Sequence, residues 1–269
     1  MSSSPIEPSQ PTHPDHEFDW TLWELTEEDD DVPESTDQTQ GIRTLMSILE
    51  VWLEEKGWDH LYVGSDQFFA WMQKRPLVRL SPDVYIFEPP PGERRFKTLQ
   101  MWEPDHNPPR IGIEFVSTSN RSKDHRDSHL KYDQLGAQEL VLFEPEAAHA
   151  LGPWPLKVYR RDSDGRWQQA EHPNDRAPIW LNTLEAWILM AWSADGPRLR
   201  LSRDAAGHDR IPTHQERAAQ ERQARLDAEQ ARLDAEQARL DAEVKHQQER
   251  EALERELIAL RALIESQDP

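Results

Sequence analysis

Two carboxylates in the first half of the chain stand where they could hold a divalent metal ion. Asp83 begins the segment Asp83-Val84-Tyr85-Ile86-Phe87, and Glu114 lies within Ile111-Gly112-Ile113-Glu114-Phe115. Magnesium prefers oxygen ligands and usually takes only one or two carboxylates from a protein. If the two segments are adjacent strands, Asp83, Glu114 and the main-chain carbonyl of Phe115 could bind Mg²⁺ (or Mn²⁺) beside a phosphate. Such a metal would polarise a phosphodiester and generate hydroxide from water near neutral pH.

Spacing alone leaves this pair open to a second interpretation. Carboxylates at this separation are common, and Pro82-Asp83 is equally typical of a turn. Phosphodiester hydrolysis also needs a positive charge, usually from Lys, close to the negative charge that develops in the transition state. The elements around the two carboxylates therefore decide whether they can act together.

Short apolar segments separated by Gly and Pro predict a sheet that could position them. Residues 61–63, 67–71 and 84–87 are β-branched or aromatic and are typical of strands in a hairpin-rich sheet. Residues 139–143 are almost wholly apolar, which favours an interior strand. Asp164-Gly165 predicts a hairpin between two further strands. The late segments 184–190 and 199–201 close the domain.

Two helices are predicted beside this sheet. Apolar residues at helical spacing begin at Ile42, and Gly57 is a plausible C-terminal cap. The acidic residues Glu50, Glu54 and Glu55 lie on its other side, where they are either a solvated face or a source of one more metal ligand. A second, more polar helix extends from residue 119 and stops at Gly136.

The composition divides the chain into three parts. Residues 1–40 hold 12 acidic and no basic residues and form an acidic, largely disordered arm, whose aromatic residues around Trp20 and Trp23 could dock on the domain or on a partner. Residues 41–210 form the folded domain and are nearly neutral. The formal net charge of −20 therefore does not exclude DNA as a partner, but the electrostatic support for DNA binding is weak.

Residues 211–269 form the third part and repeat with a period of seven. Leu226, Leu233 and Leu240 alternate with Gln230, Gln237 and Val244 at spacings of four and three, which predicts a long helix with one coiled-coil seam. Gln in the seam weakens its core, so residues 214–264 either join a homo-oligomer or form a solitary helix stabilised by salt bridges.

Several classes of protein are excluded by what the sequence lacks. It has no cysteine, so disulfides, thiolate nucleophiles and zinc-thiolate sites are absent. The N-terminus has no basic and apolar leader, and no stretch of 18 apolar residues occurs, so we expect no membrane segment and a soluble cytoplasmic protein.

A family resemblance emerges from the order of motifs between Leu80 and Pro145. The motifs are Leu80-Ser81-Pro82-Asp83-Val84, Pro90-Pro91-Gly92-Glu93-Arg94-Arg95, Trp102-Glu103, the segment from Pro109 to Ser117, Asp124, Tyr132-Asp133-Gln134-Leu135-Gly136, Glu139-Leu140 and Phe143-Glu144-Pro145. In this order they resemble the Uma-two family of proposed restriction endonucleases, a family abundant in bacteria that belongs to the PD-(D/E)XK nuclease superfamily. The likeness covers roughly residues 40–210.

The resemblance implies a fold and a metal site. The fold would be a mixed α/β core (an α+β arrangement around a mixed sheet) with flanking helices, as in restriction endonucleases, to which the C-terminal helix or coiled coil is appended. Asp83 and Glu114 would bind the metal. Superfamily members often carry Lys two residues after this Glu, where this chain has Val116. Members of the family commonly place Lys instead at the position of Ser128.

Ser128 cannot supply the positive charge, so another residue must substitute or the site is impaired. Lys131 is three residues further along the same predicted helix and could reach the same space. Lys123 and Arg126 are weaker candidates, and His125 or His129 could act as a base. Two functions follow as expectations. One is a Mg-dependent endodeoxyribonuclease that uses Asp83, Glu114 and Lys131; the other is a catalytically inactive protein of nuclease fold that mediates assembly through its coiled coil.

Overall fold

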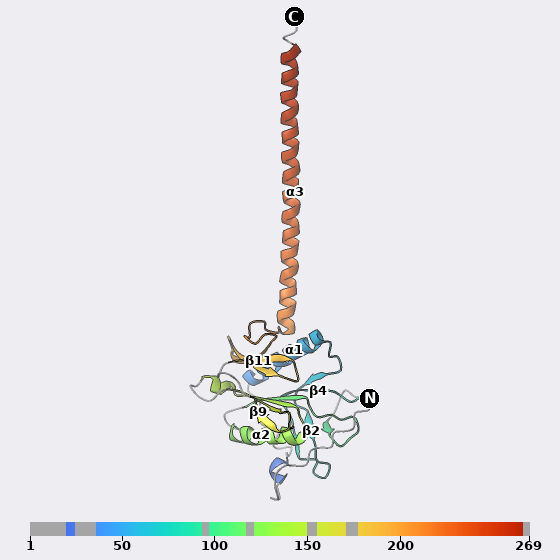
Figure 1. The fold of residues 1–269 in the computed structure, drawn as a ribbon, viewed down its shortest axis with the longest axis vertical. Helices are drawn as coiled ribbons and strands as arrows, with labels where there is room; N and C mark the ends of the chain where they lie inside the picture. The colour runs from blue at the N-terminus through green and yellow to red at the C-terminus, as the bar shows by residue number, and fades with distance from the viewer. Residues whose placement is uncertain are drawn as a thin grey trace. The chain divides into compact units, whose positions relative to one another are not determined.

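The chain is described by a computed structural model (Figure 1). The residues that the structure describes are 20–24, 36–92, 97–116, 121–149, 155–170 and 177–265. They divide into two compact units, Met1–His214 and Gln215–Pro269. This division lies close to the predicted end of the folded domain at residue 210. None of the described helices combines the length and the apolar character needed to cross a bilayer.

A mixed sheet of six strands forms the centre of the first unit, with the strand order β1-β4-β6-β7-β8-β9. Its strands are β1 (Tyr62–Gly64), β4 (Val84–Phe87), β6 (Ile111–Phe115), β7 (Glu139–Phe143), β8 (Leu156–Arg161) and β9 (Trp167–Gln169). Among the described strands of this sheet, only β6 and β7 pair in parallel, and helix α2 (Arg121–Leu135) connects them. The interior position predicted for residues 139–143 and the hairpin predicted at Asp164-Gly165 are both confirmed.

Two layers cover the two faces of this sheet (Figure 1). Helix α1 (Thr36–Lys56) and a small sheet of β10 (Ile179–Leu181), β11 (Ala186–Ser193) and β12 (Gly196–Ser202) cover one face. Helix α2 and a second small sheet of β2 (Phe68–Ala70), β3 (Arg79–Leu80) and β5 (Thr98–Gln100) cover the other. The arrangement is an α+β fold with mixed sheets, as expected.

Three details of the first unit differ from the sequence-based expectation. Helix α1 begins at Thr36, so residues 36–40, which the composition assigned to the acidic arm, are helical. The apolar spacing starts only at Ile42 because the first turn is polar. Strand β2 does not join β1 and β4 in one sheet but pairs with β3 and β5. Thr98–Gln100, where no strand is expected from the sequence, form strand β5.

Part of the acidic arm packs on its own domain. Residues Trp20–Trp23 form a short 3-10 helix, and Trp23 is buried edge-on against Trp20 and Trp71. Glu24 continues the contact through a bridge to Val78 and an ion pair with Arg75. The docking of the arm in cis is therefore confirmed for Trp23. Phe18 and Leu25, which with Trp20 and Trp23 are the spaced apolar residues of the arm, lie outside the described residues.

The second unit contains helix α3 (His214–Glu265), whose 52 residues confirm the predicted long helix. Its repeated leucines Leu226, Leu233 and Leu240 are about half exposed in the single chain. Leu253, Leu257, Leu260 and Ile264 form a second apolar seam, one residue out of register with the first, and the side chains of Leu260 and Ile264 lie outside the described residues.

Candidate metal site on the central sheet

Strand pairing brings the two predicted carboxylates together. Strands β4 and β6 are antiparallel, with Val84 opposite Ile113, so the next position places Asp83 opposite Glu114. Opposite residues in a ladder project to the same face. Because Val84 and Ile113 pack on the α1 side, Asp83 and Glu114 project toward α2. The adjacency on which the site depends is thus observed.

A main-chain donor fixes the orientation of Asp83. The amide of Phe115 donates a hydrogen bond to Oδ2 of Asp83 over 2.6 Å. In a strand, the N–H and C=O of one residue point toward the same neighbouring strand. The carbonyl of Phe115 is therefore also directed toward the side where Asp83 lies. Two carboxylates and one carbonyl give an all-oxygen donor set, which suits Mg²⁺ or Mn²⁺.

Glu114 is held by a buried tyrosine from helix α2. The hydroxyl of Tyr132 donates to Oε1 of Glu114 over 2.6 Å, and Tyr132 is only 1% exposed. The tyrosine ring can lie this close to the sheet because residue 112 is Gly. A Cβ at Gly112 would be 2.1 Å from Cε1 of Tyr132. Gly112, Glu114 and Tyr132 therefore form one packed arrangement.

The environment of Tyr132 keeps its hydroxyl protonated. Burial raises the pKa of Tyr132 well above its usual value, and the carboxylates of Glu114 and Asp83 raise it further. Because a phenolate cannot donate to a carboxylate, the protonated form is the one that can orient Glu114. Tyr132 was part of the family motif but was not predicted as a site residue. The signal that could have found it is the pair of Gly112 and Glu114, which leaves space for a ring beside the carboxylate.

The predicted cation Lys131 lies in different surroundings. Its Nζ is 5.9 Å from the centre of the Trp23 ring, a cation–π contact with the acidic arm. Ser128 is four residues before Tyr132 and shares its helix face. Lys131 directly precedes Tyr132, so its side chain points about 100° away from that of Tyr132 around the helix. His129 stacks on Tyr159 at 5.5 Å between ring centres. The side chains of Lys123, His125 and Arg126 lie outside the described residues.

Strand register identifies another lysine that sequence analysis did not consider. Glu114 pairs with Leu142 on β7, and Leu142 pairs with Lys157 on β8. Because its neighbours Leu156 and Val158 pack on the α1 side, Lys157 projects to the same face as Glu114. Two strand spacings, roughly 10 Å, separate their Cα atoms. Lys157 therefore stands in the same cross-strand row as Asp83 and Glu114.

The donor set at this site is small. Within the ranges that the structure describes, no group of three or more His, Cys, Asp or Glu side chains is arranged to hold a metal ion. A cation at Asp83 and Glu114 would therefore complete its shell with the Phe115 carbonyl and water, as Mg²⁺ commonly does.

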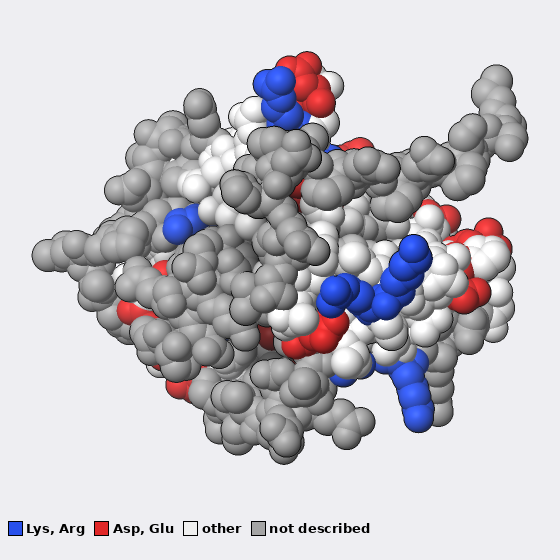
Figure 2. All heavy atoms as spheres, turned by 90° about the horizontal axis from the view of Figure 1, so that it is seen from below, with Lys and Arg blue, Asp and Glu red and all other residues white. Residues whose placement is uncertain are grey.

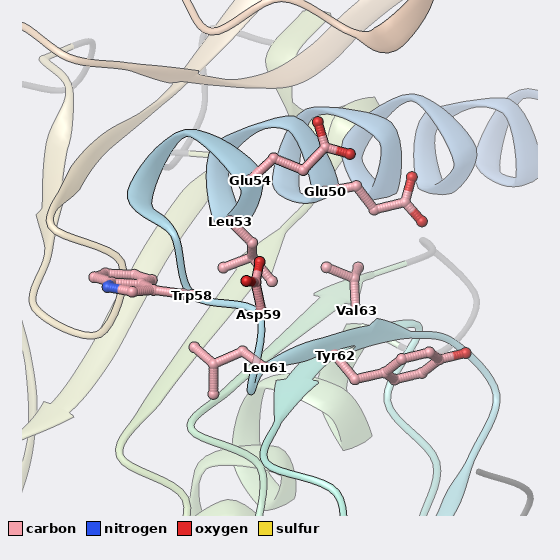
Figure 3. A pocket seen from close by; sticks show the side chains of 8 residues that line it. All are labelled: Glu50, Leu53, Glu54, Trp58, Asp59, Leu61, Tyr62 and Val63. Atoms are coloured by element: carbon pink, nitrogen blue, oxygen red, sulfur yellow. The ribbon is translucent and has the colours of Figure 1, made fainter.

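A hollow on the α1 side of the sheet is lined by Glu50 and Glu54 of the first helix (Figure 3), whereas Glu55 forms an ion pair with Arg203. Its volume is about 220 Å³, and its lining consists of Glu50, Leu53, Glu54, Trp58, Asp59, Leu61, Tyr62 and Val63. Leu53, Leu61 and Val63 belong to the core on the α1 side. Glu50 and Glu54 therefore lie on the face opposite Asp83 and Glu114 and contribute no ligand to that pair.

The surface charge agrees with weak electrostatic attraction to DNA. Figure 2 views the molecule from below, the side of α2 and β2 in Figure 1. In the described part of that face, Lys and Arg side chains lie beside Asp and Glu side chains and do not form one continuous basic area. Nonspecific affinity for the phosphate backbone depends on such basic areas.

Comparison with known proteins gives a family match. The profile of the Uma2 (Uma-two) family, described as "Putative restriction endonuclease", matches residues 31–191. No curated protein matches the chain. A solved structure from Anabaena variabilis, titled as that of a putative nuclease belonging to DUF820, is similar with 13% identity and a TM-score of 0.41. That similarity covers 57% of this chain and 75% of the other.

Proposed function

Since the chain belongs to the Uma2 family of putative restriction endonucleases, we propose that it is a metal-dependent endodeoxyribonuclease. Asp83, Glu114 and the carbonyl of Phe115 would bind Mg²⁺ or Mn²⁺, and the substrate would be a DNA phosphodiester. The observation that carries the proposal is the pairing of Asp83 with Glu114 on adjacent strands, with both carboxylates fixed by hydrogen bonds.

The protein groups would contribute orientation and charge. When bound, the metal would polarise the phosphoryl group and lower the pKa of a water ligand. The amide of Phe115 holds Asp83, and the hydroxyl of Tyr132 holds Glu114, so neither carboxylate has to reorganise during the reaction. Replacing a group that orients a metal ligand in this way typically lowers metal affinity or activity by about 10- to 100-fold.

The positive charge would come from a lysine. Lys131 is the candidate on helix α2, but its Nζ contacts the ring of Trp23. Lys157 is the candidate in the cross-strand row of Glu114. For Lys131 to act, its side chain would have to leave the ring, whereas Lys157 already projects to the face of the carboxylates. We therefore include both lysines in the proposal and expect a larger contribution from Lys157.

A second candidate function is a non-catalytic protein with the same fold. It is favoured by Ser128, which shares the helix face of Tyr132 but carries no charge, and by the contact of Lys131 with Trp23. In that case the long helix α3 would provide the function through assembly with another protein.

A cleavage assay distinguishes the two candidates. Supercoiled plasmid would be incubated with Mg²⁺ or Mn²⁺ and with wild type, Asp83→Asn, Glu114→Gln or Ser128→Lys. Glu54→Gln is the matched control, because Glu54 is an exposed carboxylate of helix α1 on the other side of the sheet. Cleavage by wild type and Glu54→Gln, with loss in Asp83→Asn and Glu114→Gln, supports the nuclease. No cleavage by wild type and gain in Ser128→Lys supports the non-catalytic protein.

A further inference from the structure

Helix α3 exposes an apolar seam over two identical heptads and a third in which Val244 replaces the last Gln. Leu226, Leu233, Leu240 and Val244 are 54%, 48%, 45% and 57% exposed, respectively. In coiled-coil notation the leucines occupy position d, and Gln230, Gln237 and Val244 occupy position a. Exposed leucines at this regular spacing on one helix are typical of a surface that packs against a second helix.

Acidic residues line both edges of the seam. Position e is always Asp, at Asp227, Asp234 and Asp241. Position g is always Glu, at Glu229, Glu236 and Glu243. Because side chains at e and g face the partner helix, they determine which partners and which orientations are allowed.

The Glu edge and the Asp edge differ in the basic residues that lie beside them on the same helix. Each Glu at position g has an Arg four residues before it, and Arg239 lies 3.7 Å from Glu243. Asp227 and Asp234 have only Gln and Ala at distances of three and four residues along the helix, whereas Asp241 has Val244 and Lys245 after it at these distances. Gln230 and Gln237 donate to Asp234 and Asp241 over 2.7 and 2.8 Å, but an amide leaves the charge in place. Asp227 and Asp234 therefore have no cation three or four residues away on their own helix.

A second copy of α3 would meet this seam with like charges in either orientation. In a parallel pair, position g faces position e of the following heptad, so Glu229 would face Asp234 of the second copy. In an antiparallel pair, e faces e and g faces g, which sets Asp against Asp and Glu against Glu. Both arrangements repeat the repulsion in every heptad. Gln at position a adds little apolar area to offset it.

We propose that this seam binds an α-helical protein segment with Lys or Arg at its e and g positions, and that it does not pair with a second copy of the chain. The leucines supply the apolar contact, and the two acidic edges select a basic partner. This inference does not depend on the proposed nuclease activity, since it rests on α3 alone.

The test uses the full-length chain and two peptides that differ only in charge. The first peptide has the sequence of residues 220–247 of this chain. The second is the same sequence with Lys at the e and g positions and with Glu replacing Arg at position c, so that the pairing within the helix is kept. Binding of each labelled peptide to the full-length chain is measured by fluorescence anisotropy. Sedimentation equilibrium gives the oligomeric state of the chain by itself.

The basic peptide should bind at least about tenfold more tightly than the native-sequence peptide at low salt, and the difference should shrink as salt is added. The full-length chain should sediment as a monomer. A basic peptide that binds no more tightly than the native one would overturn the proposal. So would a dimer of the full-length chain that dissociates when the seam leucines are replaced.

Matched variants separate the seam from the rest of the helix. The triple variant Leu226→Gln, Leu233→Gln, Leu240→Gln should lose binding of the basic peptide. The variant Ala228→Gln, Ala235→Gln, Ala242→Gln changes the opposite side of the helix and should keep it. Circular dichroism should give equal helix content for both variants, because all six positions are exposed. Equal loss of binding in both would contradict the assignment of the seam.

Discussion

Replacing Tyr132 with Phe removes one hydroxyl and leaves the shape of the packed site unchanged. That hydroxyl donates to Glu114 over 2.6 Å and is buried against Gly112. A hydrogen bond to a charged group contributes about 1.5 to 3 kcal/mol. Because Glu114 is partly buried and water can replace some of the donor, we expect a loss near the lower end, about 1.5 kcal/mol of unfolding free energy at pH 7.

The same variant changes how stability depends on alkaline pH. The raised pKa of Tyr132 means that the folded chain keeps this proton where the unfolded chain, with a pKa of about 10, releases it. Its contribution is therefore fully present below pH 10 and is lost as pH rises from 10 through the folded-state pKa. The wild type should lose up to about 1.4 kcal/mol per pH unit from this residue. Tyr132→Phe should lack that part of the slope.

Urea denaturation between pH 7 and pH 11, followed by circular dichroism, measures both effects. Tyr62→Phe serves as the control, because Tyr62 is 53% exposed and packs edge-on against Phe87. The reasoning is refuted if Tyr132→Phe and Tyr62→Phe have the same unfolding free energy at pH 7 and the same alkaline slope. That result would mean that the hydroxyl of Tyr132 is not a buried donor to Glu114.

Three further predictions concern the same sheet. Gly112→Ala places a Cβ against the Tyr132 ring and should cost about 1 to 3 kcal/mol of unfolding free energy in urea titrations. Glu139→Ala leaves the main-chain amides of Asn182 and Thr183, in the turn between β10 and β11, without their buried acceptor and should cost about 3 to 5 kcal/mol, measured in the same way. Lys157→Met should lower the rate of DNA cleavage about 10-fold or more, and Lys131→Met should lower it less. Equal rates for the two lysine variants would contradict the assignment of Lys157.

Local patterns in the sequence predicted those elements whose structure is determined by their own residues and by burial in the core. The apolar run at residues 139–143 indicated an interior strand because both of its faces are buried. Asp164-Gly165 indicated a hairpin because its backbone favours a tight turn. The pairing of Asp83 with Glu114 could be stated only as a condition, since no local pattern encodes which strands are neighbours.

The remaining features depend on contacts between distant segments. Helix α1 starts before its apolar face does, so periodicity missed its first turn. The contact of Tyr132 with Glu114 needs the space above Gly112, which appears only after the helix is packed on the sheet. Lys131 contacts the ring of Trp23 in the acidic arm, and these two segments lie far apart in the sequence. The row that holds Lys157 follows from the register of three strand pairs.

The central claim is that Asp83 and Glu114 hold one divalent cation. Electron paramagnetic resonance of free Mn²⁺, titrated with the protein, measures this directly and does not require turnover. We predict that wild type and Glu54→Gln bind Mn²⁺, and that Asp83→Asn and Glu114→Gln weaken binding at least about 10-fold. Unchanged Mn²⁺ binding in Asp83→Asn and Glu114→Gln, or no binding by the wild type, would contradict the claim.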